Sequence, residues 1–172
     1  MRMKMRIETE RLIITEFTPD MAEIVHENSL DEDNRRFSEE VFETVEDARE
    51  TIEYLISQYG RSDGALVYPL ITKDTGANIG YVQLAVIDGG AREIGYHIAK
   101  RYTRQGYATE AVRAFLPVMA ERLGLSEIWG ICVKENIASR SVLIKCGFEP
   151  VYEGTGLYRG EQREIFRGVW KA

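Results

Sequence analysis

The hydrophobic positions of this chain change between the two-residue period of strands and the 3.6-residue period of helices. Residues 11–17 form an apolar, β-branched run that predicts a first strand, with residues 1–6 as a frayed lead-in. A helix is expected over residues 18–28, with Thr18 as its N-cap and Pro19 in its first position. The pattern therefore opens with one strand and one helix.

A second helix is predicted over residues 44–59, because Thr44 and Asp47 have the spacing of a capping box ahead of an apolar stripe. Three strand-like segments follow it, separated by turn residues. They cover residues 65–72, 78–87 and 91–99. Sequential strands with short turns imply an antiparallel meander.

Helical spacing returns over residues 106–123, where an apolar stripe ends at Gly124. Pro117 lies inside this helix and removes one backbone hydrogen bond, so a kink or a local widening is expected there. The remaining segments are a strand at 128–133, a helix at 136–147 capped by Asn136, and a hairpin of 148–153 and 163–170. The order β-α-α-β-β-β-α-β-α-β-β predicts an α/β fold around a mixed sheet in one domain, 1–172.

Composition excludes several classes of protein. A chain of 172 residues is long enough to bury a core, and its net charge of −6 argues against a nucleic-acid partner. No apolar run approaches the roughly 20 residues of a membrane span, and the basic start lacks the apolar region of a secretory signal. We therefore expect a cytoplasmic protein without a membrane partner, either a monomer or a homodimer.

The residues that most often bind metals are few. Cys132 and Cys146 are too far apart for a CxxC motif and both lie in apolar patterns, so they are predicted to be small core residues. Only two histidines, His26 and His97, are present, and no metal site is expected.

Residues 31–50 carry nine acidic side chains against three basic ones. Two interpretations are open. Such a run is usually a solvated helix face. Alternatively, these residues would form an acidic rim that attracts a cationic substrate, the acceptor of a transferred group.

The stretch at 101–111 joins the strand at 91–99 to the long helix. Gly106 allows a tight turn, and Arg101 and Arg104 flank it. A helix that begins here presents unpaired N–H groups and the positive end of its dipole, which suit a phosphate. The sequence therefore predicts a pyrophosphate cradle.

Several motifs occur together in an order that resembles the GNAT superfamily of acetyl-CoA-dependent N-acetyltransferases. They are Glu93-Ile-Gly-Tyr96, the loop and helix at 101–111, and Asn136-x-x-Ser139 followed by Gly147-Phe148. The opening Glu10-Arg-Leu12 and the closing hairpin resemble the branch that contains the ribosomal-protein N-terminal alanine and serine acetyltransferases. The resemblance covers nearly the whole chain. It implies a mostly antiparallel sheet with helices on both faces, in which strands 91–99 and 127–134 are parallel neighbours that splay apart.

The resemblance also implies acetyl-CoA as co-substrate, with its pyrophosphate on the loop N–H groups and its pantetheine arm along the strand edge near Ile98. The family's loop motif, (Gln/Arg)-x-x-Gly-x-(Gly/Ala), maps onto residues 103–108. Gly106 and Ala108 fit, whereas Thr103 and Arg104 depart from it, and Arg104 would either contact a phosphate or crowd the loop. The residues expected to bind the cofactor are Ile98, Ala99, Arg104, Gln105, Gly106, Tyr107, Ala108, Thr109, Asn136, Ser139 and Arg140, with Lys145 as a further candidate.

Two residues are catalytic candidates by the same resemblance. Glu93 matches the position of a catalytic glutamate that takes the proton of the amine, directly or through water; the alternative is an exposed or ion-paired strand residue, and His97 is the second choice. Ser139 would hydrogen-bond the thioester or thiolate, or simply cap its helix. Many relatives place a proton-donating tyrosine further along this helix, where this chain has Leu143.

The implied function is transfer of an acetyl group from acetyl-CoA to a primary amine by direct attack in a ternary complex. The acceptor would be a protein N-terminus, a polyamine or an aminoglycoside-like sugar. Two other classes stay open: an acetyl-CoA-binding sensor on the same fold, and an unrelated α/β protein whose loop holds another phosphate ligand.

Overall fold

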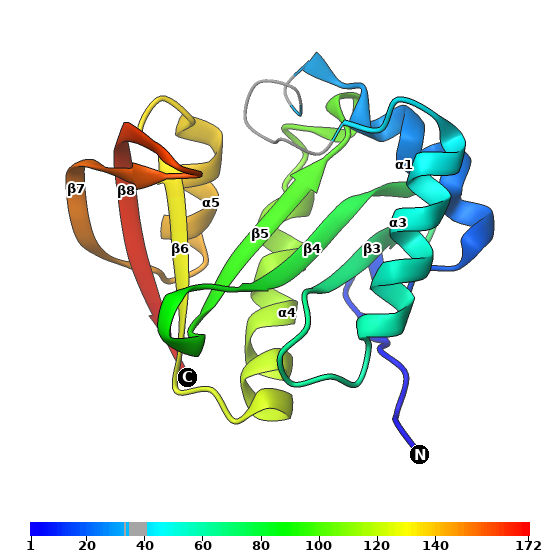
Figure 1. The fold of residues 1–172 in the computed structure, drawn as a ribbon, viewed down its shortest axis with the longest axis horizontal. Coiled ribbons are helices and arrows are strands. Elements are labelled where there is room, and N and C mark those ends of the chain that lie inside the picture. The colour runs from blue at the N-terminus through cyan, green and yellow to red at the C-terminus, as the bar shows by residue number, and fades with distance from the viewer. Residues whose placement is uncertain (33, 35–40) are drawn as a thin grey trace.

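An eight-stranded sheet runs through the part of the chain that the computed structural model describes, residues 1–32, 34 and 41–172 (Figure 1). Its strand order is β1-β2-β3-β4-β5-β6-β8-β7. The strands are β1 (Ile7–Glu8), β2 (Leu12–Ile14), β3 (Leu66–Thr72), β4 (Asn78–Val86), β5 (Arg92–Ile98), β6 (Glu127–Val133), β7 (Glu149–Tyr158) and β8 (Glu161–Lys171). The helices are α1 (Ala22–Ser29), α3 (Val45–Gln58), α4 (Tyr107–Leu123) and α5 (Ile137–Lys145).

The described strands pair in antiparallel fashion except β5 and β6, which are parallel neighbours. These two strands share one paired position, Glu93 opposite Trp129. Beyond it they diverge, as Figure 1 shows in the gap between the green and yellow strands. The predicted splay is confirmed.

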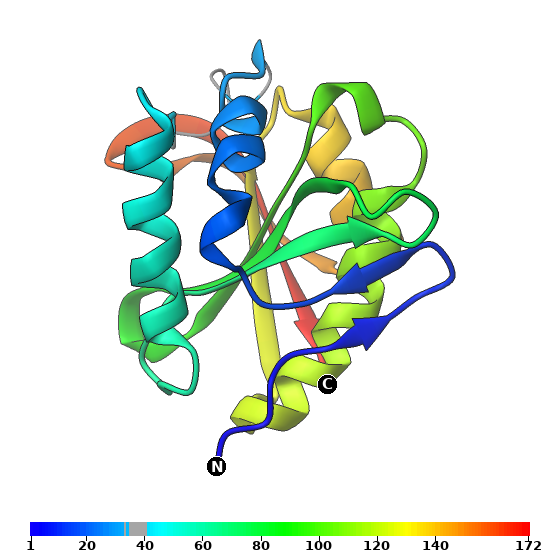
Figure 2. The ribbon, with the colours of Figure 1, turned by 90° about the vertical axis from the view of Figure 1, so that its right-hand side faces the viewer.

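Helices cover both faces of the sheet, as predicted (Figure 2). On one face α1 and α3 close a small core that includes Ile52 and Val67. On the other face α4 and α5 cover the main core, which includes Phe115 and Phe166. Cys132 and Cys146 are buried there as free thiols, as expected.

The local capping signals were mostly correct. The Thr44 hydroxyl accepts from the Asp47 N–H (3.1 Å), and the Asp47 carboxylate accepts from the Thr44 N–H (3.0 Å), which confirms the capping box. The helix expected at 18–28 instead begins with a 3₁₀ turn at Pro19–Met21. Thr18 is the N-cap of this turn and Pro19 its first residue, as predicted, but the Thr18 hydroxyl donates to the Asp20 carboxylate and caps no backbone N–H.

Both ends of the chain carry more sheet than expected. Residues 1–6 are not a frayed lead-in, because Met5 is buried and its N–H donates to Glu16 Oε1 (2.9 Å). Strand β1 follows and pairs with β2. The closing hairpin continues to Tyr158 opposite Glu161, through glycines that argue against a strand by composition.

Helix α4 is α-helical without interruption across Pro117. No π-turn occurs within its residues 107–123, so the predicted local widening is absent. The phosphate end of this helix is therefore joined to the core by one continuous element.

Candidate active site

A cleft of about 1420 Å³ opens where β5 and β6 separate. Side chains from β4, β5, the loop before α4, β6, α5 and the tip of the β7–β8 hairpin line it. Most predicted site residues meet here. The cleft is lined by Glu93, Ile98, Arg104, Gly106, Tyr107, Ala108, Thr109, Asn136 and Ser139, and also by Lys145.

Three predicted cofactor residues are not part of this lining. Ala99 is fully buried, and its N–H donates to the Ile79 carbonyl (2.8 Å). The Gln105 side chain donates to the Arg101 carbonyl (3.4 Å). Arg140 forms an ion pair with Glu153 and lies 5.0 Å from the Phe166 ring centroid, because it projects from α5 toward β7 and β8.

The loop before α4 has the geometry of an anion cradle. Gly106 is the N-cap in the left-handed region (φ 82°), and the first turn-closing bond runs from the Glu110 N–H to the Gly106 carbonyl (3.0 Å). A glycine N-cap brings no side chain, so the N–H groups of Tyr107, Ala108 and Thr109 are left for a ligand. These residues line the cleft. The arrangement fits a pyrophosphate.

Arg104 also adopts the left-handed region, with φ 61°. Glycine takes this conformation without strain, which explains why a glycine is common at this point of the motif. Here the chain holds an exposed arginine that lines the cleft next to the cradle. Its position suits contact with a phosphate.

The start of α4 is held from outside the cleft. Arg11 lies over the Tyr107 ring, 4.1 Å from its centroid, and its Nε donates to Glu110 Oε1 (3.2 Å). Thr9 adds a second bond to the Glu110 carboxylate (3.2 Å). The strand β2 region thus fixes the first turn of the helix.

The splay leaves strand-edge groups of β5 facing the cleft. Ala99 uses its N–H toward β4, and successive residues of a strand direct their backbone groups to opposite sides. The N–H and C=O of Ile98 and Tyr96 therefore face the side from which β6 has departed. Such groups need a partner, and an extended amide ligand can supply one.

Glu93 lines this cleft from β5, on the strand face that it shares with His97. Burial raises the pKa of Glu93 to about 7, and the positive charge of Arg159 partly offsets this effect. A carboxyl group with a pKa near neutrality is suited to accept a proton at physiological pH.

Ser139 meets a residue to which the sequence assigned no role. The Tyr96 hydroxyl lies 2.9 Å from Ser139 Oγ and donates to the Ser139 carbonyl at 2.9 Å. Burial raises the pKa of Tyr96, so its hydroxyl stays protonated. The Ser139 N–H donates to Asn136 Oδ1 (3.1 Å), which confirms that Asn136 caps α5. Leu143, at the position of the family tyrosine, is buried in the core.

Tyr96 was within the Glu93-Ile-Gly-Tyr96 motif, which is the only signal that pointed to it. Its contact with Ser139 crosses from β5 to α5, 43 residues along the chain. A contact between residues so far apart in the chain depends on how β5 and β6 splay. Local sequence patterns do not encode the splay.

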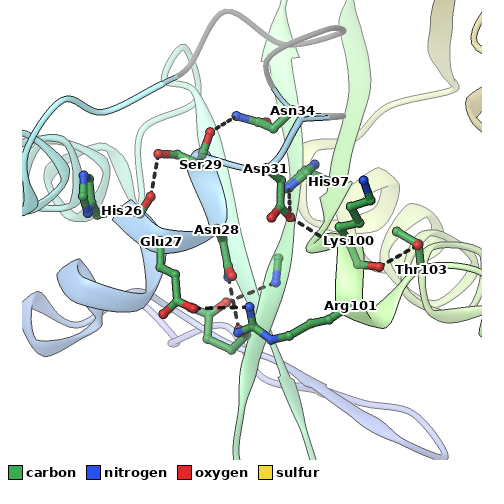
Figure 3. Close-up of polar contacts among 12 residues, drawn as sticks. His26, Glu27, Asn28, Ser29, Asp31, Asn34, His97, Lys100, Arg101 and Thr103 are labelled. Atoms are coloured by element: carbon green, nitrogen blue, oxygen red, sulfur yellow. Dashed lines mark hydrogen bonds and ion pairs between the residues drawn. The ribbon is translucent and has the colours of Figure 1, made fainter.

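On the face of β5 that carries Glu93, His97 Nε2 lies 3.8 Å from Asp31 Oδ2 (Figure 3). The same Asp31 oxygen accepts from the Lys100 N–H (2.6 Å), and Glu32 lies 3.5 Å from Lys100 Nζ. These two members of the predicted acidic rim are therefore engaged within the protein. Residues 33 and 35–40 of that rim lie outside the described residues.

A family model for the acetyltransferase (GNAT) domain matches residues 11–149. The uncharacterized N-acetyltransferase YnaD of Bacillus subtilis (strain 168) is 31% identical over 144 residues, which cover 83% of this chain and 82% of YnaD. The structure of a GNAT-family acetyltransferase from Bacillus anthracis superposes with a TM-score of 0.82 at 27% identity, covering 97% of this chain and 98% of that one.

The ribosomal L7/L12 α-N-protein acetyltransferase RimL, solved in complex with coenzyme A, has a TM-score of 0.79 at 17% identity. The match covers 97% of this chain and 98% of RimL and shows that the two share a fold. The chain belongs to the GNAT acetyltransferase family, and it is an acetyl-CoA-dependent acyltransferase.

Two further observations concern the described residues alone. None of their helices is both long and apolar enough to cross a membrane. Within the same residues, no group of three or more His, Cys, Asp or Glu side chains is placed to hold a metal ion.

Proposed function

We propose that this protein transfers the acetyl group of acetyl-CoA to a primary amine by direct attack in a ternary complex, with Glu93 as the base. The observation that carries the proposal is the position of Glu93. Its carboxyl group, with a pKa of about 7, lines the same cleft as the uncapped start of α4.

The cofactor would be held by main-chain and polar groups along one wall of the cleft. The N–H groups of residues 107–109 and the side chain of Arg104 suit the pyrophosphate, with Lys145 nearby. The free edge of β5 at Ile98 suits the amides of the pantetheine arm. Asn136 and Ser139 at the start of α5 would lie near the thioester.

The reaction forms a C–N bond, breaks a C–S bond and removes a proton from the amine. The amine nitrogen bonds to the thioester carbonyl carbon, the C–S bond breaks, and coenzyme A leaves as a thiolate. Glu93 takes the proton that the amine loses, directly or through a water molecule. Holding both reactants in one cleft replaces a bimolecular encounter by an oriented one.

The leaving thiolate needs a proton or a hydrogen bond. The Ser139 hydroxyl is the candidate donor, and Tyr96 holds it through a 2.9 Å contact. For this role the protonated Tyr96 hydroxyl would turn from the Ser139 carbonyl and donate to Ser139 Oγ, while the Ser139 hydroxyl donates to the thiolate. A hydrogen bond to such an anion is stronger than one between neutral groups. The Tyr96–Ser139 pair would do the work of the proton-donating tyrosine that many relatives have at the position of Leu143.

The acceptor is proposed to be a protein N-terminus, a polyamine or an aminoglycoside-like sugar. The shared fold of RimL, an α-N-protein acetyltransferase, supports the first of these. We further propose a cytoplasmic protein of a single domain, 1–172, acting as a monomer or a homodimer.

The test has two stages. Calorimetric titration with acetyl-CoA and with coenzyme A measures binding, and thiol release over a panel of amines and N-terminal peptides measures turnover. We expect micromolar binding and amine-dependent release. The Glu93→Gln variant should bind acetyl-CoA normally and lose about 10²- to 10⁴-fold in kcat/KM.

Other outcomes would show which part of the proposal is wrong. Binding without release from any amine would favour an acetyl-CoA sensor, for which the Leu143 substitution is the supporting observation. A Glu93→Gln enzyme that retains over half its kcat across the pH range would exclude Glu93 as the base.

A further inference from the structure

Arginines occur both outside the cleft and in its lining, where Arg104 lies next to the cradle. Many of those outside the cleft form ion pairs with a carboxylate, as the guanidinium groups of Arg11, Arg61 and Arg101 do with Glu110, Asp63 and Glu27. Arg159 and Arg167 line the cleft with Glu93. Among the residues that the structure describes, neither has a carboxylate within ion-pair distance.

Arg167 is held in place by rings instead of by a counter-charge. Its guanidinium carbon lies 5.7 Å from the Trp129 ring centroid and 5.5 Å from that of Tyr152. Stacking between two aromatic groups orients a guanidinium and leaves its N–H donors available. The side chain is exposed on the acceptor side of the sheet.

Arg159 lies at the tip of the β7–β8 hairpin, with its guanidinium carbon 5.2 Å from the Tyr158 ring centroid. Its charge acts on Glu93 across the cleft, which is the lowering contribution to the pKa of that carboxyl. The second arginine is therefore close enough to the proposed base for its charge to act on it.

Strand register gives the separation between the backbone positions of Glu93 and Arg167. Glu93 pairs with Trp129 on β6, and Ile131 of β6 pairs with Arg167 on β8. Glu93 and Arg167 are thus two strands apart on one face of the sheet, which is on the order of 10 Å between their backbones. A small molecule or three residues of an extended peptide can span that length.

We propose that Arg167, assisted by Arg159, binds a carboxylate of the acceptor while the acceptor's amine lies at Glu93. The acceptor class is then a primary amine that carries a carboxylate within about 10 Å of the reacting nitrogen. A guanidinium presents paired N–H donors that match a carboxylate. This inference rests on the proposed function, and it favours a peptide N-terminus over a polyamine or an aminoglycoside-like sugar.

Among the residues that the structure describes, the acidic groups that line the cleft do not cancel the two arginines. Glu135 also lines the cleft, and it pairs with Arg163 at 2.7 Å. Asp88 lies in the turn between β4 and β5, at another part of the lining. The arginine donors therefore remain open to a ligand anion.

The experiment compares acceptors in which the carboxylate is replaced by a neutral group or by a second amine. One series pairs 6-aminohexanoate with hexylamine and with 1,6-diaminohexane. A second uses C-terminally amidated peptides, Ser-Glu-Ala-Ala against Ser-Gln-Ala-Ala and Ser-Lys-Ala-Ala, so that the glutamate side chain is the only carboxylate. We expect the carboxylate-bearing member to have a kcat/KM about 10- to 100-fold higher, as for a hydrogen bond to a charged group.

Variants assign the effect to the arginine. Arg167→Gln should remove the preference by raising KM for the carboxylate-bearing acceptor, with KM for acetyl-CoA unchanged, and Arg167→Lys should restore part of it. The matched control is Arg122→Gln, because Arg122 is an exposed residue of α4 that does not line the cleft. It should keep the wild-type preference.

A binding measurement separates this inference from the proposed function. Calorimetry on the protein saturated with coenzyme A compares 6-aminohexanoate with hexylamine without requiring turnover. Tighter binding of 6-aminohexanoate that Arg167→Gln abolishes supports the inference even if no acetyl transfer is detected. Equal affinities, or no binding of either compound, would overturn it. The series with the larger preference shows whether the carboxylate comes from a small molecule or from a peptide.

Discussion

At the scale of single residues, the site depends on one carboxyl group held away from water. Folding raises the pKa of Glu93 from 4.5 to about 7, chiefly through burial. The folded state therefore keeps a proton that the unfolded state releases between these pH values. The free energy of unfolding falls as the pH rises through this window, and the loss is complete above pH 7.

Replacing Glu93 should consequently stabilise the protein in a pH-dependent way. The Glu93→Gln variant is expected to gain up to about 3 kcal/mol in free energy of unfolding at pH 8 and much less at pH 4.5. Urea denaturation at both pH values measures the difference. Glu50→Gln, on the exposed surface of α3, serves as control and should change stability by less than about 0.5 kcal/mol. An equal gain at both pH values would show that the ionised carboxylate carries no burial cost.

Tyr96 and Ser139 should act as a unit. Tyr96→Phe removes the hydroxyl 2.9 Å from Ser139 Oγ and is expected to lower kcat about 10-fold while leaving KM for acetyl-CoA nearly unchanged. Adding Ser139→Ala should then cost little more, because residues in one hydrogen-bond network are not additive. Steady-state kinetics of both single variants and the double variant measure this. Tyr54→Phe, on the exposed part of α3, is the control. Fully additive effects would contradict the coupling.

At the scale of elements, the two ends of α4 offer a matched comparison. Gly106 and Gly124 both have left-handed backbone, at φ 82° and 63°, and an added Cβ would meet nothing closer than 3.5 Å at either. Alanine at each position should cost about 1 kcal/mol of stability through backbone strain. Only Gly106→Ala should also raise KM for acetyl-CoA. Thermal denaturation and acetyl-CoA titration of both variants check this, and equal KM values would argue against the cradle.

The sequence predicted correctly those elements whose defining interactions join residues close together in the chain. The capping box at Thr44 and the Asn136 cap were found this way, because donor and acceptor are three residues apart. Strand β1 was missed, since it is two residues long and exists through its pairing with β2. The direction of Arg140 was missed for a related reason. Its partner Glu153 lies on β7, and only the tertiary packing of α5 brings the two together.

Much of the site could likewise be predicted where a motif carried it. Glu93, Gly106 and Asn136 line one cleft, as the resemblance implied. The part of the cleft where we propose that the acceptor binds could not be predicted. Arg159 and Arg167 come from the closing hairpin, and their place in the same cleft as Glu93 follows from the insertion of β8 between β6 and β7.

At the scale of the whole molecule, the proposed binding of acetyl-CoA in the splay would make it a structural partner as well as a substrate. A ligand that binds the folded state alone stabilises it by about 2.7 kcal/mol at 100 times its Kd. For a domain of this size we expect Tm to rise by about 5–10 °C. Differential scanning fluorimetry with acetyl-CoA and with coenzyme A measures the shift. Gly106→Ala should show a smaller shift at the same ligand concentration, and an unchanged Tm for the wild type would contradict binding in the splay.

The strand order has a consequence for how the protein is made. From β1 to β6 every strand lies beside the one that precedes it in the chain. Strands β1–β5 and helix α4 are contained in residues 1–123, and domains begin to form as the chain is synthesised from its N-terminus. The phosphate cradle can therefore form on the ribosome before Trp129, Ser139 and Arg167 have emerged. The opposite wall of the cleft is added afterwards, so we expect the nascent chain to gain acetyl-transfer activity only once β6, α5 and β8 have been made.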